Sequence, residues 1–449
     1  MVAIEMDEFV QRLETVALVD RIGRVEAISL NALRVSGLSD RLRLGERVAI
    51  RCGQPEAGGE VTAILRDHVL VLPDDGMERI RIGAMVRPAG PDVIHPDDSW
   101  IGRVIDASGQ PLDGRPLLPG RHARPLLDVP PAPAGRRALG ARIETGLCCF
   151  DTFLPVVRGQ RIGLFAGSGV GKSSLLASFA RDMAADVVVM ALIGERGREL
   201  RHFIDQVLQA EGMARSVVVA ATSDRSAGMR RRCIWTAMTI AEHFRDQGRH
   251  VLLLADSVTR FADAHREIAA AAGEPMAMRG YPASLSSQIM ALAERAGPGA
   301  TGQGDITAIM TVLVAGSDMD EPVADILRGT LDGHVVLDRA IAERGRFPAI
   351  NLLRSISRSL PAAASEAENA LLLEARRVIA TWEQAEMMIQ AGLYVAGSDP
   401  RIDEAIRLWP ALDGFLAGRQ DKGPRSSFAT LAHLLGRAAP TTTHDTGTT

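Results

Sequence analysis

Residues 163–180 of the chain read GLFAGSGVGKSSLLASFA. An apolar run ends at Ala166, a glycine-rich stretch follows, and a segment with apolar residues at helical spacing begins at Lys172. This order of strand, glycine-rich turn and helix is the phosphate-binding loop pattern, in which backbone N–H groups wrap the oxygens of an anion. Ala166 stands where the pattern has its first glycine. The stretch therefore predicts a nucleotide site on an α/β core.

The loop and the first helical turn supply the predicted nucleotide contacts. Lys172 can reach the β- and γ-phosphates, and the hydroxyl of Ser173 can ligate Mg²⁺. The helix that begins here points its N-terminal N–H groups at the same anion. The alternative, a glycine-rich turn without a ligand, is disfavoured by the GKS sequence with a strand before it and a helix after it. The predicted nucleotide-binding residues are Gly167, Ser168, Gly169, Val170, Gly171, Lys172, Ser173 and Ser174.

Two acidic residues follow other apolar runs. Asp256 ends HVLLLAD, where an acid at the carboxyl end of a buried strand can reach Mg²⁺ through a water molecule. Glu195 follows a second such run, and its carboxylate could polarise the water that attacks a γ-phosphate. Arg196 is assigned to the same site, where it could orient the loop. The structural alternatives are an aspartate that caps the next turn and a surface glutamate in a charged loop.

The rest of the chain predicts a fold of three parts. Between residues 145 and 360, nearly continuous apolar runs alternate with helical segments, which is typical of a parallel sheet buried on both faces. Residues 19–95 contain short β-rich runs broken by Gly, Asp and Pro, which favour a small closed barrel. After Pro361 the chain is helical in pattern and rich in Ala, Glu and Leu. The predicted fold class is α/β, with a parallel-sheet core, an N-terminal β-barrel and a C-terminal helical domain.

The chain ends carry two further expectations. Phe9, Leu13 and Val16 lie at helical spacing among charged residues, which predicts an amphipathic helix that either packs on its own domain or docks a partner. The last residues are rich in threonine, which is typical of disorder. The expected divisions are this helix at 1–18, the barrel at 19–95, the nucleotide-binding domain with its connector at 96–360, the helical domain at 361–435 and the tail at 436–449.

Composition excludes several classes of protein. The net charge is −4 and the isoelectric point is near 6.2, which argues against wide coverage of nucleic acid. Aromatic residues make up only 4% of the chain, so base-stacking platforms are scarce. There is no apolar run of the length that spans a membrane, and no signal peptide pattern. The four cysteines lack metal-ligand spacing, and we expect reduced thiols in a cytosolic protein.

Several segments together carry a family resemblance. They are GERGRE at 194–199, LLLADSVTRFADAHREI at 252–268, RGYPAS at 279–284, PAINLLRSIS at 348–357 and YVAGSDP at 394–400. They resemble the ATPase family that includes the catalytic subunit of rotary ATP synthases, and more closely the ATPases of type III protein export. The loop, RGYPAS and YVAGSDP are similar to the flagellar branch of these export ATPases.

The resemblance implies a RecA-like core and a ring of six identical subunits, with Mg²⁺-ATP bound at the interfaces. It implies that Glu195 activates the lytic water and that Asp256 is the second acid on the metal side. Arg358 matches the arginine that enters the site of the neighbouring subunit, where it stabilises charge on the transferring γ-phosphoryl group. Phe347 stands where the family stacks an aromatic ring on adenine, here Phe in place of Tyr.

The resemblance also implies a cellular role and partners. ATP hydrolysis would drive delivery and unfolding of chaperone-bound flagellar export substrates. A regulatory, stator-like protein would dock on the helix at 1–18, and a central stalk protein would enter the ring. The ring would lie in the cytoplasm, associated peripherally with the export gate at the inner membrane under the flagellar base.

Four alternatives remain beside this hypothesis. The first is the ATPase of a virulence-type secretion system. A rotary ATP synthase subunit is disfavoured because residues 370–420 lack a dense acidic run. An RNA translocase of the Rho type is disfavoured because residues 19–95 contain no Trp, Tyr or Phe. A binding module with an inactive site is disfavoured by the presence of Lys172, Glu195 and Asp256 together.

Overall fold

A computed structural model describes residues 21–29, 32–314, 319–420 and 422–440. The helix expected at 1–18 and the tail expected at 436–449, apart from its first five residues, lie outside these ranges. The chain forms two compact units. Of the described residues, the first unit contains those up to 93 together with 225–229 and 264–275, and the second contains the others.

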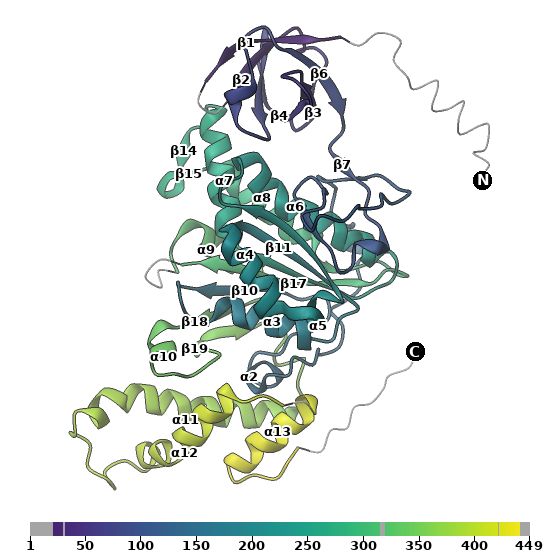
Figure 1. Cartoon of the computed structure of the whole chain (residues 1–449). Coiled ribbons are helices and arrows are strands. Elements are labelled where there is room, and N and C mark those ends of the chain that lie inside the picture. The colour runs from purple at the N-terminus through teal and green to yellow at the C-terminus, as the bar shows by residue number, and fades with distance from the viewer. Residues whose placement is uncertain (1–20, 30–31, 315–318, 421, 441–449) are drawn as a thin grey trace. The chain divides into compact units, whose positions relative to one another are not determined.

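The first unit is built on a closed six-stranded antiparallel barrel (Figure 1). Its strand order is β1-β2-β5-β4-β3-β6, and pairing of Gly23 with Val86 closes it. Alternate residues such as Val25, Val35 and Val69 point inward and are fully buried, as the period of two in a strand requires. The predicted barrel is confirmed. Its strands are β1 (Gly23–Ile28), β2 (Leu33–Ser36), β3 (Arg47–Ile50), β4 (Ala57–Ile64), β5 (His68–Pro73) and β6 (Met85–Gly90), with a 3-10 turn at Met77–Arg79.

The second unit is built on a nine-stranded sheet, ordered β19-β18-β10-β17-β13-β11-β12-β8 with β16 paired to β17. The strands from β18 to β8 are parallel, and β19 and β16 are antiparallel additions. The central strands are mostly apolar, as burial under helices on both faces requires, and the predicted parallel sheet is confirmed. The strands are β8 (Val104–Asp106), β10 (Arg161–Ala166), β11 (Val187–Glu195), β12 (Ser216–Thr222), β13 (Val251–Asp256), β16 (Gly297–Pro298), β17 (Asp305–Leu313), β18 (Gly333–Leu337) and β19 (Ile350–Ser357).

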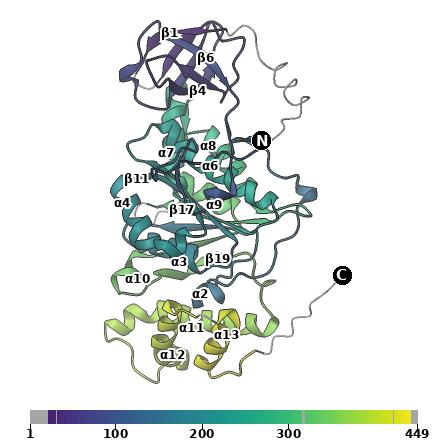
Figure 2. The same ribbon diagram turned by 45° about the vertical axis from the view of Figure 1, so that its right-hand side comes forward.

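Helices lie on both faces of this sheet (Figures 1 and 2). The crossovers that run from β10 to β11 to β12 place α3 to α5 on one face, and those that run back place α6, α8 and α9 on the other, as right-handed connections require. The helices are α3 (Lys172–Asp182), α4 (Gly197–His202), a π-helical turn (Phe203–Leu208), α5 (Gln209–Met213), α6 (Ala227–Asp246), α7 (Val258–Ala271), α8 (Ser284–Arg295), α9 (Pro322–Thr330) and α10 (Arg339–Glu343). Short strands lie at Val93–Ile94, Arg124–Pro125, Met276–Ala277 and Tyr281–Pro282, and 3-10 turns at Asp98–Trp100, Pro133–Gly135 and Met278–Gly280.

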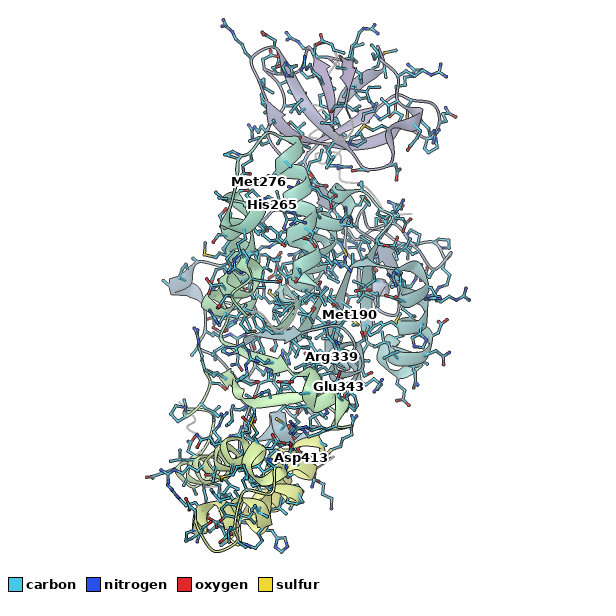
Figure 3. All side chains as sticks on the ribbon, turned by 90° about the vertical axis from the view of Figure 1, so that its left-hand side faces the viewer. Met190, His265, Met276, Arg339, Glu343 and Asp413 are labelled. Atoms are coloured by element: carbon cyan, nitrogen blue, oxygen red, sulfur yellow. The ribbon has the colours of Figure 1, made fainter. Side chains whose placement is uncertain are left out.

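Three helices complete the second unit, which confirms the predicted helical C-terminal region. They are α11 (Glu366–Gln390), α12 (Pro400–Ala417) and α13 (Gly423–Leu434), and they pack near α2 (Cys148–Asp151). A capping box of Ser365 and Glu368 begins α11. Asp399 caps α12, and Pro400 suits its first turn. In Figure 3, Met190 lies inside the sheet layer, whereas Arg339 and Glu343 mark α10 above the helix α12 that carries Asp413.

Candidate active site

The phosphate-binding loop joins the end of β10 to the start of α3. Gly169 and Gly171 have φ of 77° and 84°, in the left-handed region that only glycine enters freely. No side chain caps the N-terminus of α3, so its first N–H groups remain available to an anion. Val170 is buried and anchors the loop. Ser168, Ser173 and Ser174 are exposed, as contacts to a ligand require.

The backbone conformation of Ala166 explains why the loop tolerates alanine in place of its first glycine. It is the last residue of β10, and it lies outside the left-handed region that would demand glycine. The N–H of Val314, at the end of the neighbouring strand β17, donates to its carbonyl at 3.0 Å. The loop therefore begins from an ordinary strand end, where alanine carries no conformational cost.

Lys172 and Asp256 are brought together at the carboxyl ends of the parallel strands. The Lys172 ammonium forms an ion pair with Oδ1 of Asp256, and the two side chains are only 11% and 7% exposed. Asp256 ends β13, which is separated from β10 by β17. The hydroxyl of Thr311 on β17 donates to the same Oδ1 at 2.9 Å. A phosphate that binds Lys172 must therefore take the place of a carboxylate.

Glu195 lies at the end of the adjacent strand β11, whose Leu192 is in register with Asp256. Burial raises the pKa of the Glu195 carboxyl, the negative charge of Asp256 raises it further, and the positive charge of Lys172 acts in the opposite sense. A carboxylate with a raised pKa accepts a proton more readily than an ordinary glutamate. Three of the predicted site residues thus share one edge of the sheet.

Arg196 is not brought to this group. It precedes α4 as its N-cap residue, its side chain is 74% exposed, and it pairs with Glu199 one helical turn later at 3.2 Å. Within one subunit it therefore belongs to the surface of the charged loop.

Phe347 lies over the end of the phosphate-binding loop. A Cβ atom added to Gly171 would be 3.0 Å from Cδ1 of Phe347, so the ring packs directly against this glycine. Half of the Phe347 side chain remains exposed, which leaves a ring face for a base to stack on. The structure thus brings an aromatic ring far along the chain to the predicted phosphate site.

Arg358 lies away from the loop of its own chain. It follows β19, whose last residue Ser357 pairs with Gly333 at the start of β18. Its backbone N–H donates to Asp332, and its guanidinium donates to the carbonyl of Arg328 at 3.2 Å. The side chain is exposed and is free of any carboxylate partner among the residues described by the structure.

The donor set around the loop suits Mg²⁺ bound with a nucleotide. No group of three His, Cys, Asp or Glu side chains that could hold a metal ion is found in the described part of the chain. Mg²⁺ keeps several waters and takes one or two protein oxygens beside substrate phosphates. The exposed hydroxyl of Ser173 and the carboxylate of Asp256 fit that requirement.

Among the described residues, no helix is long and apolar enough to cross a membrane.

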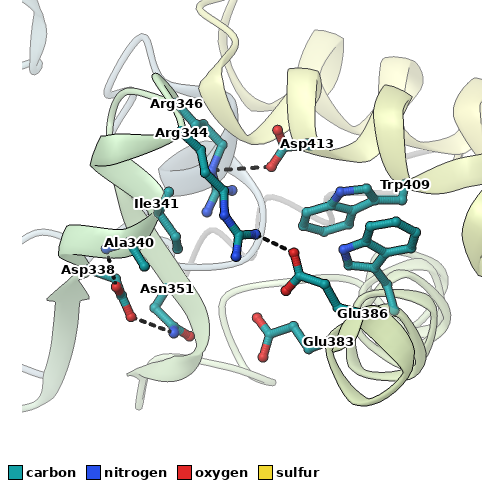
Figure 4. A pocket seen from close by; sticks show the side chains of 11 residues that line it. Asp338, Ala340, Ile341, Arg344, Arg346, Asn351, Glu383, Glu386, Trp409 and Asp413 are labelled. Carbon is teal, nitrogen blue, oxygen red and sulfur yellow. Dashed lines mark hydrogen bonds and ion pairs between the residues drawn. The ribbon is translucent and has the colours of Figure 1, made fainter. Parts of the chain in front are cut away.

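A separate pocket of about 270 Å³ lies between α10 and the helices α11 and α12 (Figure 4). Trp382 and Trp409 stack on one another with their ring centroids 5.4 Å apart. Ion pairs cross the pocket from Arg344 to Glu386 and from Arg346 to Asp413. No residue of the phosphate-binding loop lines it, so the loop and this pocket are distinct.

Comparison with known proteins places the site in a wider group. Residues 146–357 match the model of the ATP synthase alpha/beta family, nucleotide-binding domain. Residues 364–437 match the model of the T3SS EscN ATPase C-terminal domain. The flagellum-specific ATP synthase of Caulobacter vibrioides is 45% identical over 437 residues, which cover 94% of this chain and 98% of that protein.

Two solved structures share the fold over almost the whole chain. One is the assembled ATPase EscN of the type III secretion system of enteropathogenic E. coli, with 36% identity and a TM-score of 0.84, covering 92% of this chain and 99% of that one. The other is the same ATPase with its central stalk EscO, with a TM-score of 0.83, 36% identity, and coverage of 92% and 100%.

Proposed function

Since the chain belongs to the ATP synthase alpha/beta family and is an ATP-hydrolysing enzyme of that family, we propose that it powers flagellar type III protein export. The observation that carries the proposal is the convergence of Lys172, Asp256 and Glu195 beside an uncapped helix N-terminus. The resulting work is delivery and unfolding of chaperone-bound flagellar export substrates. The likeness to a flagellum-specific relative over nearly the full length supports this assignment.

Each site residue has a separate role in the proposed hydrolysis of ATP. The loop N–H groups and Lys172 hold the β- and γ-phosphates, and Lys172 exchanges Asp256 for phosphate oxygens. Ser173, and Asp256 through water, would hold Mg²⁺, which would neutralise charge on those oxygens. Glu195 takes a proton from water as the water oxygen bonds to the γ-phosphorus and the bond to the ADP oxygen breaks. The proton then passes from Glu195 to solvent.

The complete site requires a second copy of the chain. Arg358 would reach the γ-phosphate of a neighbour, Phe347 would stack on adenine, and Arg196 would orient the loop that carries Glu195. A homohexamer follows as the proposed state. Structures of EscN as an assembled ATPase and in complex with its central stalk EscO support both a ring and a stalk partner for this chain.

The remaining partners follow from the same role. We place a regulatory stator-like protein on the helix at 1–18, and export chaperones with their cargo on the ring. The ring would work in the cytoplasm, peripherally attached to the export gate at the inner membrane under the flagellum. Nucleic acid is not a partner in this proposal, because the net charge of the chain is −4.

A virulence-type secretion ATPase is the second candidate. The match of the C-terminal helices to the EscN domain model favours it. The identity to EscN is 36%, against 45% to the flagellar relative, which supports the flagellar role first.

Phosphate release from Mg²⁺-ATP tests the enzyme, and motility tests the pathway. Glu195→Gln should abolish hydrolysis but retain ATP binding, whereas Glu211→Gln, an exposed change on α5, should leave the rate near wild type. In the source bacterium, a deletion strain should lack flagellar filaments and should regain them only with an active enzyme. Normal filaments in the deletion strain, with loss of another secretion activity, would transfer the assignment to the second candidate.

A further inference from the structure

Thr311 carries a buried hydroxyl near the end of a mostly apolar strand. It lies near the end of β17 (Asp305–Leu313), between β10 and β13, and is fully buried. Ala255 on β13 is in register with Met310, so Thr311 lies level with Asp256. Its hydroxyl donates to Oδ1 of Asp256 at 2.9 Å. A hydrogen bond to an ionised carboxylate is among the stronger kinds, and both residues of this pair are buried.

Two donors share this one oxygen atom. Lys172 forms its ion pair with Oδ1 as well, and Oδ2 of Asp256 has no hydrogen-bond partner within the described ranges. The proposed function requires Lys172 to leave Asp256 and bind phosphate. The hydroxyl of Thr311 is then the donor that remains on Oδ1.

We propose that Thr311 is a positioning residue that holds the Asp256 carboxylate when nucleotide draws Lys172 away. With Oδ1 retained by Thr311, Oδ2 would remain available to accept hydrogen bonds from the waters that Mg²⁺ would carry. This inference rests on the proposed function. It means that Thr311 on β17 contributes to the affinity for nucleotide that depends on Mg²⁺.

The same strand offers a comparison residue. Thr307 lies four residues earlier, on the same face and about 13 Å away along the strand, and it is also fully buried. Its hydroxyl accepts a hydrogen bond from the N–H of Gly159 at 2.9 Å and lies 2.8 Å from Nε2 of His250. Thr307 therefore joins strands and loops remote from Asp256. A change at Thr307 disturbs the sheet as a change at Thr311 does, but leaves the carboxylate alone.

Binding of a fluorescent ADP analogue to the full-length protein, with Mg²⁺ and with EDTA, separates the two roles. Thr311→Val keeps the volume of the side chain and removes the donor. In EDTA we expect this variant to bind the analogue with the affinity of the wild type. The gain in affinity on adding Mg²⁺ should be about tenfold smaller in the variant than in the wild type. Thr311→Ser should retain that gain, and Thr307→Val should retain it even if its thermal unfolding temperature falls.

Three outcomes would overturn the assignment. They are a full Mg²⁺ gain in Thr311→Val, an equal loss in Thr307→Val, and a failure of Thr311→Ser to retain the gain. If valine prevents folding, Thr311→Ala and Thr311→Ser form the decisive pair, because both lack the methyl group and only serine keeps the hydroxyl. Failure of the proposed function is a different result, since the wild-type protein itself would then not hydrolyse Mg²⁺-ATP.

Discussion

Arg358 and Lys172 lie at opposite ends of the same sheet. Lys172 begins α3 just beyond the carboxyl end of β10, where Ala166 is in register with Leu337 of β18. Arg358 follows Ser357, which pairs with Gly333 at the start of β18. From Gly333 to Leu337 the strand advances by four residues, so about 13 Å separates the two levels. That separation exceeds the reach of an arginine side chain, so Arg358 does not contact the phosphate-binding loop of its own chain.

Mixing two inactive variants tests this arrangement. Arg358→Ala and Glu195→Gln should each abolish turnover in a homogeneous ring, because every interface lacks one of the two groups. In an equal mixture, about a quarter of the interfaces combine an intact Glu195 with an intact Arg358 of the neighbour, and about a quarter of the wild-type rate should return. Phosphate release is measured beside mass photometry of the same samples.

Two results would contradict the ring. One is a mixture as inactive as its parts although hexamers form. The other is a wild-type rate per subunit that stays constant as dilution separates hexamers into monomers.

The raised pKa of Glu195 predicts an acid limit to catalysis. The water-activating group must be ionised, and burial together with the charge of Asp256 favours its protonated form. As pH falls, kcat/KM should therefore decline through a pKa above that of an ordinary glutamate. ATP binding by Glu195→Gln provides the control, because binding should not follow the same titration. A rate that is flat down to the ordinary glutamate pKa would remove Glu195 from this role.

The phosphate site could be predicted from local sequence, but its surroundings could not. The loop pattern, the strand before it and Asp256 at the end of a later strand are all features of contiguous residues. Thr311 carried one weak signal, a hydroxyl in an apolar run, and its meaning depends on β17 lying between β10 and β13. The order of strands across a sheet is set by long-range packing, which no local pattern contains.

For Arg196 and Phe347, distance along the sequence does not predict distance from the site in space. Arg196 follows Glu195 directly in the sequence, yet its side chain turns to Glu199 in solvent. Phe347 is distant in sequence from Gly171, yet its ring packs against it. The barrel and the helical region were predictable because the spacing of apolar residues differs between strands and helices. The helix at 1–18 stays a prediction.

The contact of Phe347 with the loop predicts a contribution to nucleotide affinity. Phe347→Ala removes the ring that would stack on the base, and a stack of this kind is worth about 1–3 kcal/mol. The dissociation constant of Phe347→Ala for ATP should rise about tenfold or more, whereas Phe347→Tyr should bind ATP like the wild type. Leu373→Ala, which removes a similarly exposed apolar side chain on α11, is the control for calorimetric titration. Unchanged affinity in Phe347→Ala would place adenine elsewhere.

His250 predicts a loss of stability in mild acid. Burial lowers the pKa of this histidine to about 4, whereas the unfolded chain takes up the proton near the ordinary value of about 6.5. The unfolded state thus binds more protons between these values, and the free energy of unfolding should fall by up to about 3 kcal/mol as pH drops through that window. His250→Gln should flatten this dependence in urea unfolding, while the exposed His433→Gln should leave it intact. An equal slope in both variants would show that other groups govern it.

A buried ion pair between Glu242 and Arg295 predicts a strong coupling of α6 to α8. Both side chains are only 4% exposed, and they meet through two hydrogen bonds of 2.6 and 2.9 Å. Arg295→Met leaves a buried carboxylate without its cation and should lower the free energy of unfolding by about 3–5 kcal/mol. The double variant with Glu242→Leu removes both charges and should recover most of that loss, which denaturant unfolding of the four proteins measures. If the two single effects simply add, the pair has no coupling energy, and the contacts of Arg295 with Thr239 and the carbonyl of Leu126 carry its stabilising effect instead.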